Sequence, residues 1–120
     1  MNKVPRQSNN RRGDPLEKTI ERRVCSYAER EYGMEVRKFV SSNHRCVPDR
    51  MFFGDNGLIF FIEFKRKGLK LTIGQGREKS RLEKKGARIY VVDGVDAGKE
   101  LIDRIVEDHN FRHEVGGWIR

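Results

Sequence analysis

Residues 48–65 constrain the fold more than any other stretch of the chain. They contain two apolar, aromatic-rich segments on either side of an Asp-Asn-Gly cluster at residues 55–57. Two such segments around a glycine-containing turn predict a β-hairpin. Each segment also carries one acidic residue, Asp49 or Glu63, where a core strand would ordinarily carry Val or Ile. These two departures from the apolar pattern are the first candidates for a functional site.

The hairpin pattern also predicts how these charges are arranged. Strand side chains alternate between the two faces of a sheet, so Glu63 and Lys65 share one face and Phe64 lies on the other. Asp49 precedes the turn by about six residues and Glu63 follows it by about six, so antiparallel pairing brings them opposite or diagonal to each other. A simple surface ion pair is the alternative, but the flanking residues are so apolar that these charges would then be stranded near a core.

Two converging carboxylates repel each other unless one holds a proton or a cation lies nearby. Mg²⁺ removes this conflict, because it takes oxygen ligands and is typically held by one or two carboxylates and substrate phosphate. Lys65 would then lie beside the attacking water, where it can steer or deprotonate that water or neutralise charge on the phosphate. The arrangement predicts metal-dependent chemistry on a phosphate ester.

The charge balance points to the same class of substrate. The 120 residues include 26 Lys and Arg against 18 Asp and Glu, which gives a formal net charge of +8. Such a chain attracts polyanions, and nucleic acid is the first to consider. No apolar run approaches the roughly 20 residues that span a membrane, and the N-terminus lacks the apolar core of a signal peptide, so we expect an intracellular protein. The two cysteines form neither a metal-type pair nor a disulfide framework.

The chain is expected to form a flexible basic arm over 1–13 and a single domain over 14–120. An N-cap at Asp14 followed by Pro15 predicts a helix to about Tyr32, ended by Gly33. Apolar residues in the C-terminal tail, including Phe111 and Trp118, suggest packing onto the domain or onto a second copy. The other expected elements are strands over 35–40 and 87–93, the latter buried on both faces, and helices over 75–85 and 96–109. The predicted fold is α/β, a central mixed β-sheet flanked by α-helices.

The first predicted helix has an unusual apolar face. Glu17 and Glu21 fall inside or at the margin of the arc formed by its apolar residues. One of these carboxylates is therefore expected to face something other than water. The alternative is an ordinary pair with basic neighbours on a solvated edge of the helix.

The combination of these residues resembles a known family. Pro48-Asp49 followed by Glu63-Phe64-Lys65 resembles the PD-(D/E)xK nuclease signature. With Val47 before it and Gln75 at the head of the next helix, the pattern is similar to the VRR-NUC branch of that superfamily, particularly its small stand-alone phage and bacterial members. The resemblance covers residues 16–92 and implies a restriction-endonuclease-like core.

The resemblance also implies roles for individual residues. Asp49 and Glu63 correspond to metal ligands, the Phe64 carbonyl to a further ligand, and Lys65 to the catalytic lysine. Mg²⁺ is the implied cofactor, with Mn²⁺ able to substitute, and no small-molecule cofactor is expected.

Two further site residues are implied by the same family. A glutamate from the first helix completes the site; the chain offers Glu17 and Glu21, and spacing to the helix-ending glycine favours Glu21. Gln75 corresponds to a glutamine whose amide can orient a water or a phosphate. The chain departs from the family at Cys46, where glycine is usual, and at residues 72–74, where a Ser-Pro pair is more common. Both departures affect loop shape and leave the geometry of the substrate open.

These features predict a divalent-metal-dependent DNA endonuclease. Its small size and single active site suggest a homodimer, and its resemblance to structure-specific nucleases suggests branched or Holliday junction DNA. The alternatives are a non-catalytic basic DNA-binding protein and a sequence-specific restriction-type endonuclease. A phage-encoded protein that acts in the host cytoplasm fits the resemblance. The residues expected to contact phosphates are Arg66, Lys67, Lys70, Arg77, Lys79 and Arg81.

Overall fold

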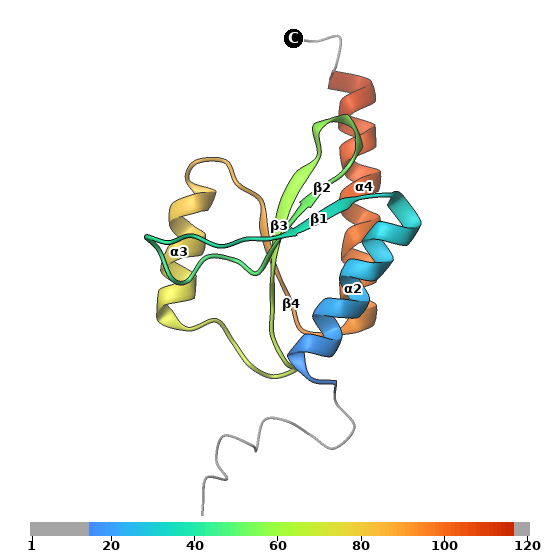
Figure 1. The fold of residues 1–120 in the computed structure, drawn as a ribbon. Coiled ribbons are helices and arrows are strands. Elements are labelled where there is room, and N and C mark those ends of the chain that lie inside the picture. Colours follow the sequence, from blue (N-terminus) through green and yellow to red (C-terminus); the bar gives the residue numbers. More distant parts are fainter. Residues whose placement is uncertain (1–14, 117–120) are drawn as a thin grey trace, which may run out of the picture.

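The computed structural model describes residues 15–116. The predicted arm over 1–13, the predicted N-cap Asp14 and the tail residue Trp118 lie outside these described residues. The order of helices and strands is the one predicted from the sequence (Figure 1). The elements are α2 (Glu17–Tyr32), β1 (Glu35–Lys38), β2 (Arg50–Phe53), the short 3₁₀ turn η1 (Asp55–Gly57), β3 (Ile59–Phe64), α3 (Ile73–Glu83), β4 (Ile89–Val92) and α4 (Val95–Gly116).

The four strands form one mixed sheet in the order β1-β2-β3-β4. The pairs β1–β2 and β2–β3 are antiparallel, and β3–β4 is parallel. The predicted hairpin is confirmed, with Arg50 opposite Ile62 and Phe53 opposite Ile59. Its turn uses left-handed backbone at Asn56 (φ 59°) and Gly57 (φ 77°), a conformation that these two residue types adopt most readily.

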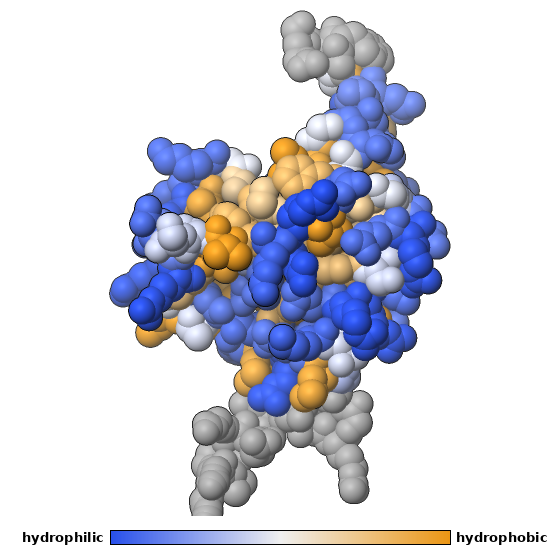
Figure 2. Space-filling model, in the orientation of Figure 1, coloured by the Kyte–Doolittle hydropathy of each residue, from blue (hydrophilic) through white to orange (hydrophobic). Residues whose placement is uncertain are grey.

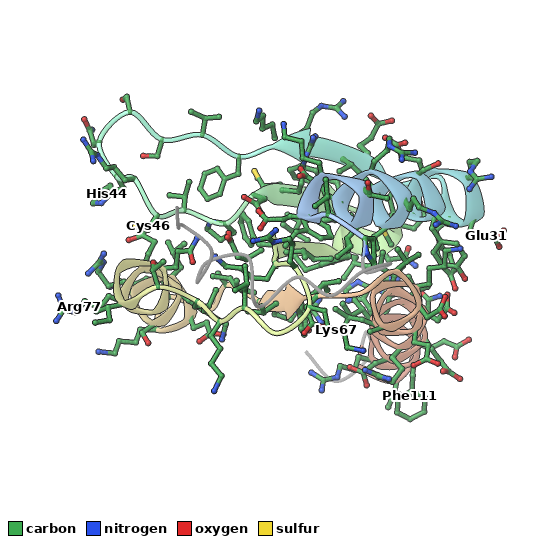
Figure 3. The ribbon with its side chains drawn as sticks, turned by 90° about the horizontal axis from the view of Figure 1, so that it is seen from below. Glu31, His44, Cys46, Lys67, Arg77 and Phe111 are labelled. Carbon is green, nitrogen blue, oxygen red and sulfur yellow. The ribbon has the colours of Figure 1, made fainter. Side chains whose placement is uncertain are left out.

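Helices cover both faces of the sheet. In Figures 1 and 3, α2 and α4 lie on one side of the sheet and α3 lies on the other. The α2/α4 side contains the main core, in which the rings of Phe52 and Phe60 stack with centroids 4.8 Å apart. The two helices approach closely at Gly98, where an added Cβ would lie 2.5 Å from a methyl group of Val24. The predicted α/β architecture is confirmed.

Two helix starts differ from the prediction. Helix α2 begins at Glu17 rather than at Pro15, with Leu16 in the N-cap position and no side-chain cap. Helix α3 begins at Ile73, two residues before Gln75, because Thr72 caps it through a reciprocal capping box with Gln75. The glutamine therefore lies in the first turn of α3 rather than at its start.

The strands and the last helix also differ in detail. Strand β4 lies at one edge of the sheet, and it is not buried on both faces, since Val91 is 41% exposed. Strand β1 ends at Lys38, two residues earlier than predicted. Helix α4 continues to Gly116, so Phe111 belongs to the helix rather than to a tail. None of the helices within residues 15–116 is long and apolar enough to cross a membrane.

Candidate active site

The register of the hairpin places Asp49 opposite Glu63. Arg50 pairs with Ile62, and one step further along both strands leads to these two acidic residues. Residues directly opposite each other in an antiparallel pair share a face, and here it is the face that α3 covers. The Oδ2 atom of Asp49 accepts a hydrogen bond from the backbone N–H of Phe64 at 2.8 Å, which fixes its carboxylate against β3. The structure thus brings together the two carboxylates that the sequence pattern singles out.

Glu63 is a buried carboxylate with polar partners. It is only 5% exposed, and its Oε2 atom accepts a hydrogen bond from Nε2 of Gln75 at 2.8 Å. Lys65 lies on the same face, as predicted, with Nζ 4.0 Å from the same oxygen. Phe64 points to the opposite face and is fully buried in the core. A carboxylate, an amide and an ammonium therefore meet at the end of β3.

The site destabilises negative charge on its own carboxylates. Burial, reinforced by the neighbouring Asp49 carboxylate, raises the pKa of Glu63 to about 7. Burial also raises the pKa of Asp49, although the N–H of Phe64 acts in the opposite direction. Raised pKa values in two adjacent acids are typical of functional sites in which a cation or a proton must offset like charges.

Gln75 links the start of α3 to the active strand. Its Oε1 atom accepts the backbone N–H of Thr72 at 3.0 Å, and Thr72 Oγ1 accepts the backbone N–H of Gln75 at 3.1 Å. The other end of the same amide donates to Glu63. Sequence reasoning placed Gln75 near the site but missed Thr72, although a Thr-x-x-Gln sequence is a recognisable capping-box signal.

The two glutamates of α2 have different surroundings. The Oε2 atom of Glu21 accepts a hydrogen bond from Nε of Arg50 at 2.5 Å, in a partly buried ion pair. Both Glu17 and Glu21 act electrostatically on the site: Glu21 raises the pKa of Asp49, and Glu17 raises the pKa of Glu63. Burial and then Asp49 raise the pKa of Glu17, while Lys65 lowers it. Glu21 therefore has Arg50 as a partner, and the choice between Glu17 and the predicted Glu21 as the helix carboxylate of the site stays a prediction.

The two departures from the family pattern are in contact with each other. A Cβ atom added at Gly74 would lie 2.8 Å from Sγ of Cys46, so the cysteine side chain occupies the space next to that glycine. Cys46 also helps to line a small cavity of about 10 Å³ that reaches Glu63, Gln75 and Lys79. This volume is close to that of one water-sized probe. The loop before β2 and the start of α3 therefore form one wall of the site.

The predicted phosphate contacts have three kinds of surroundings. Lys67, Lys70 and Arg77 are exposed and make no ion pair with another described residue. By contrast, Lys79 lies 2.9 Å from Glu83 and Arg81 lies 2.8 Å from Glu78. Arg66 is half-buried and acts electrostatically on Glu17. Figure 3 shows Arg77 pointing outward from α3 and Lys67 on the loop that leads toward it.

The donor atoms fit a hard divalent cation. Oδ1 of Asp49 accepts no hydrogen bond from any residue in 15–116, so it is available beside the Glu63 carboxylate. Within the same range, no group of three or more His, Cys, Asp or Glu side chains is close enough to form a complete metal site. Two carboxylates with remaining positions for water and phosphate are the arrangement typical of Mg²⁺.

Comparison with known proteins identifies relatives of this chain. No family model matches it. A protein described as "Putative nuclease p44", from Acyrthosiphon pisum secondary endosymbiont phage 1, is 41% identical over 85 residues, which cover 71% of this chain and 90% of the relative. A solved structure described as "VRR_NUC domain" has a TM-score of 0.61 and 32% identity, and covers 70% of this chain and 95% of its own length. The hairpin site and these two relatives together show that the chain belongs to the VRR-NUC family of nuclease domains.

Proposed function

We propose that this protein is a Mg²⁺-dependent DNA endonuclease that hydrolyses phosphodiester bonds in branched or Holliday junction DNA as a homodimer. The observation that carries the proposal is the pairing of Asp49 with the buried Glu63, with Lys65 Nζ 4.0 Å from the Glu63 carboxylate. A buried carboxylate next to a half-buried one, with an adjacent ammonium, suits hydrolysis of a phosphate ester better than it suits binding alone.

Each residue of the site has a defined part in this chemistry. Asp49 and Glu63 would hold the cation, with the Phe64 carbonyl and either Glu17 or Glu21 as further oxygen donors. When bound, Mg²⁺ would supply a water of lowered pKa and stabilise negative charge on the phosphate. Lys65 Nζ orients the attacking water and neutralises charge that develops on the phosphate oxygens.

Gln75 holds the Glu63 carboxylate in one position. Its Nε2 donor fixes Oε2 of Glu63, and the capping interaction with Thr72 fixes the amide itself. A carboxylate with a restrained rotamer loses less conformational entropy when it binds a cation than a freely rotating one.

DNA binding is attributed to the exposed cations near the site. Lys67, Lys70 and Arg77 are available to phosphates, and the net charge of +8 adds long-range attraction. On the face seen in Figure 2, hydrophilic side chains predominate on both sides, over α3 and α2, and apolar and hydrophilic side chains are mixed between them. Contacts to phosphates do not depend on the base sequence, so specificity would come from the shape of the DNA. Because these contacts are electrostatic, binding should weaken steeply as the salt concentration rises.

The two-subunit form follows from the number of active sites. Each chain has one such site, and cleavage of two strands at a symmetric junction is most simply achieved by two chains related by a two-fold axis. A sequence-specific restriction-type enzyme would also use two chains, so the substrate distinguishes the two possibilities.

The proposal is tested by incubating the protein with supercoiled plasmid, linear duplex and four-way junction DNA, each with Mg²⁺, Mn²⁺ or EDTA. We expect cleavage of the junction with either metal and none with EDTA. Binding of all three DNAs without cleavage under any condition would contradict the enzyme and favour a non-catalytic binding protein. Cleavage confined to one short duplex sequence would favour a restriction-type enzyme.

Substitutions in the site test its individual roles. Asp49→Ala, Glu63→Ala and Lys65→Ala should each reduce cleavage by about a hundredfold or more while they retain most DNA binding. Asp55→Ala is a matched control, because Asp55 lies in the exposed hairpin turn. Full activity in the Lys65 variant would reject the role assigned to that ammonium.

A further inference from the structure

A second concave surface lies between α2 and the strands β1 and β2. Residues of these three elements line an open cavity of about 500 Å³, which shares no lining residue with the small cavity beside Gln75. The larger cavity reaches Glu21 and Arg50, and Arg50 directly follows Asp49 in the chain. In Figure 1, the first turns of α2 lie beside the end of β3, while α3 lies on the other side of the sheet. The cavity therefore adjoins the candidate active site, and none of the predicted phosphate contacts lines it.

Arg50 presents unused hydrogen-bond donors to this cavity. A guanidinium carries five N–H donors in a planar fork, and Arg50 uses Nε to donate to Oε2 of Glu21. Its two terminal nitrogens donate to no residue within 15–116. The side chain is 31% exposed, so Glu21 holds the fork while its outer edge stays open to a ligand. A planar fork of this kind matches the oxygen atoms of a phosphate.

Three further cations surround the fork of Arg50. Lys18 and Arg22 line the cavity one helical turn apart. Lys38 lies opposite Arg50 in the register of β1 and β2, so the two side chains share a face of the sheet. Lys18, Arg22 and Lys38 are all exposed, and none of them forms an ion pair with another residue of the described range. Four positive side chains therefore gather at one end of the cavity.

The carboxylates that line the cavity do not cancel this charge. Glu21 and Arg50 neutralise each other, and Glu29 lies about two helical turns beyond Arg22. An ion pair that only anchored α2 to the sheet would need Arg50 and Glu21, but it would gain nothing from more cations beside it, because like charges repel. The additional cations are explained by an anion that binds between them.

The positions of the cations favour a strand of DNA over a free phosphate ion. Lys18 and Arg22 lie about 6 Å apart along the helix axis, so they can reach successive phosphates rather than one. Asp49 and Arg50 are neighbours at the start of β2, and their side chains point to opposite faces, Asp49 toward α3 and Arg50 toward α2. A strand with its reactive phosphate at Asp49 would thus meet the exposed cations of residues 67–77 on one flank and Arg50 on the other.

We propose that a second phosphate-binding subsite, which we call the α2 subsite, holds the DNA strand on the flank of the active site away from α3. It consists of Lys18, Arg22, Lys38 and Arg50. Glu21 is its positioning residue, because it holds the fork of Arg50 toward the phosphate. The inference rests on the proposed function for the identity of the ligand as DNA. Binding at the α2 subsite requires neither metal nor cleavage.

Fluorescence anisotropy of a fluorescein-labelled duplex of about 30 base pairs, in EDTA, measures binding without cleavage. Lys18→Ala and Arg22→Ala should each weaken binding about fivefold at about 150 mM salt, and each should lower the slope of log K against log salt concentration by about 1. Both side chains are exposed, so circular dichroism should show an unchanged fold. Arg23→Ala is the matched control, since Arg23 is exposed on the same helix but does not line the cavity. It should change the affinity by less than about twofold.

Substitution of Arg50 separates its shape from its charge. Arg50→Lys keeps the positive charge but loses the planar fork. It should weaken binding about fivefold and leave the salt slope nearly unchanged. An Arg50→Lys variant with wild-type affinity would reject the role assigned to the fork.

The role of Glu21 is tested by the sign of its effect. If Glu21 acted only through its negative charge, Glu21→Ala would tighten the binding of DNA, because it removes repulsion from the phosphates. If Glu21 positions Arg50, the same variant should weaken binding about threefold. Glu21→Gln keeps an acceptor oxygen for Arg50, so it should bind DNA more tightly than Glu21→Ala does. Tighter binding by Glu21→Ala than by the wild-type protein would reject the positioning role.

A double variant tests whether one DNA molecule crosses the site. A strand that contacts both flanks should lose affinity in Arg22→Ala and Arg77→Ala independently, so the combined loss should be about 25-fold. A double variant no weaker than the weaker single variant would show that the two flanks bind separate DNA molecules, and it would overturn the proposal. Wild-type affinity in both Lys18→Ala and Arg22→Ala would also overturn it. So would an equal loss in Arg23→Ala, which would show that only the net charge matters.

The α2 subsite and the proposed activity fail in different ways. A protein that cleaves no DNA with any metal, but loses affinity in Arg22→Ala and not in Arg23→Ala, would keep the subsite and reject the nuclease proposal. A protein that cleaves junction DNA, and whose Lys18→Ala and Arg22→Ala variants bind it as the wild type does, would do the reverse.

Discussion

The two faces of β3 show how one strand can serve both stability and chemistry. Phe60, Ile62 and Phe64 alternate along the strand and are fully buried in the core that also contains residues of α2 and α4. Glu63 and Lys65, between and after them, face α3 and carry charge in a partly dry environment. The apolar face fixes the register, because a slip by one residue would exchange the two sets of side chains. The position of the charged side chains on one face of β3 therefore depends on the packing of the apolar side chains on its other face.

The largest expected effect on stability comes from the apolar face. Phe60→Ala should lower the free energy of unfolding by about 3 to 5 kcal/mol, because it leaves a cavity in the centre of the core. Urea denaturation followed by circular dichroism measures the change. Phe111→Ala, at an exposed aromatic residue, is the control and should change the free energy of unfolding of the monomeric chain by about 0.5 kcal/mol or less. A small loss for Phe60→Ala would show that β3 does not anchor the domain.

On the charged face, Glu63 should lower the stability of the folded protein at neutral pH, although cleavage is proposed to require it. In the metal-free protein the pKa of Glu63 is about 7, above its ordinary value of 4.5, so the folded state binds the proton more tightly than the unfolded state. Stability is therefore greatest below the unfolded pKa and declines as pH rises from about 4.5 to about 7. Urea denaturation in EDTA across this range should show the decline.

Glu63→Gln provides the comparison for that experiment. The variant should flatten the decline and be more stable than the wild-type protein at neutral pH, by about 1 to 3 kcal/mol, while it loses cleavage. An equally steep decline in the variant would mean that another group titrates.

The wall of the site should respond to side-chain volume. Gly74→Ala should lower the free energy of unfolding by about 1 to 3 kcal/mol, because the new methyl group overlaps Sγ of Cys46. Cys46→Ala in the same chain should recover much of that loss, and a double-mutant cycle measures the coupling. Additive effects of the two substitutions would show that the loop moves away from α3 at little cost.

The smallest expected effect concerns the cap of α3. Thr72→Ala should cost about 1 kcal/mol of stability through loss of the N-cap. It should also lower kcat for cleavage, since the Gln75 amide would then hold Glu63 less firmly. Ser80→Ala, within the same helix, is the control and should leave kcat unchanged. An unaltered kcat in Thr72→Ala would show that the N-cap of α3 does not influence the active site.

Much of this arrangement could be predicted from the sequence because the signals are local. The alternation along β3 and the similar distances of Asp49 and Glu63 from the turn are sufficient to place the two carboxylates opposite or diagonal to each other, and the register of the hairpin shows that they are opposite. The capping box at Thr72 is equally local, and the start of α3 could have been predicted from it.

Other features depend on contacts between distant segments. Glu17 and Glu21 fall on the same arc of a helical wheel, and only the ion pair with Arg50 distinguishes them. The exposure of Val91 depends on which parts of the sheet the helices cover, and the sequence of a single strand does not reveal that. Helix α4 extends past His109 to Gly116, although little of its last part packs on the domain.

The contact between Cys46 and Gly74 has an evolutionary consequence. Because the two residues share one small space, their sizes cannot drift independently: a relative with glycine at the position of Cys46 has room for a larger residue at the position of Gly74. The two departures of this chain from the family pattern then amount to one compensated exchange. Across an alignment of relatives, these two positions should covary in volume, large with small, while Asp49 and Glu63 beside them stay the same.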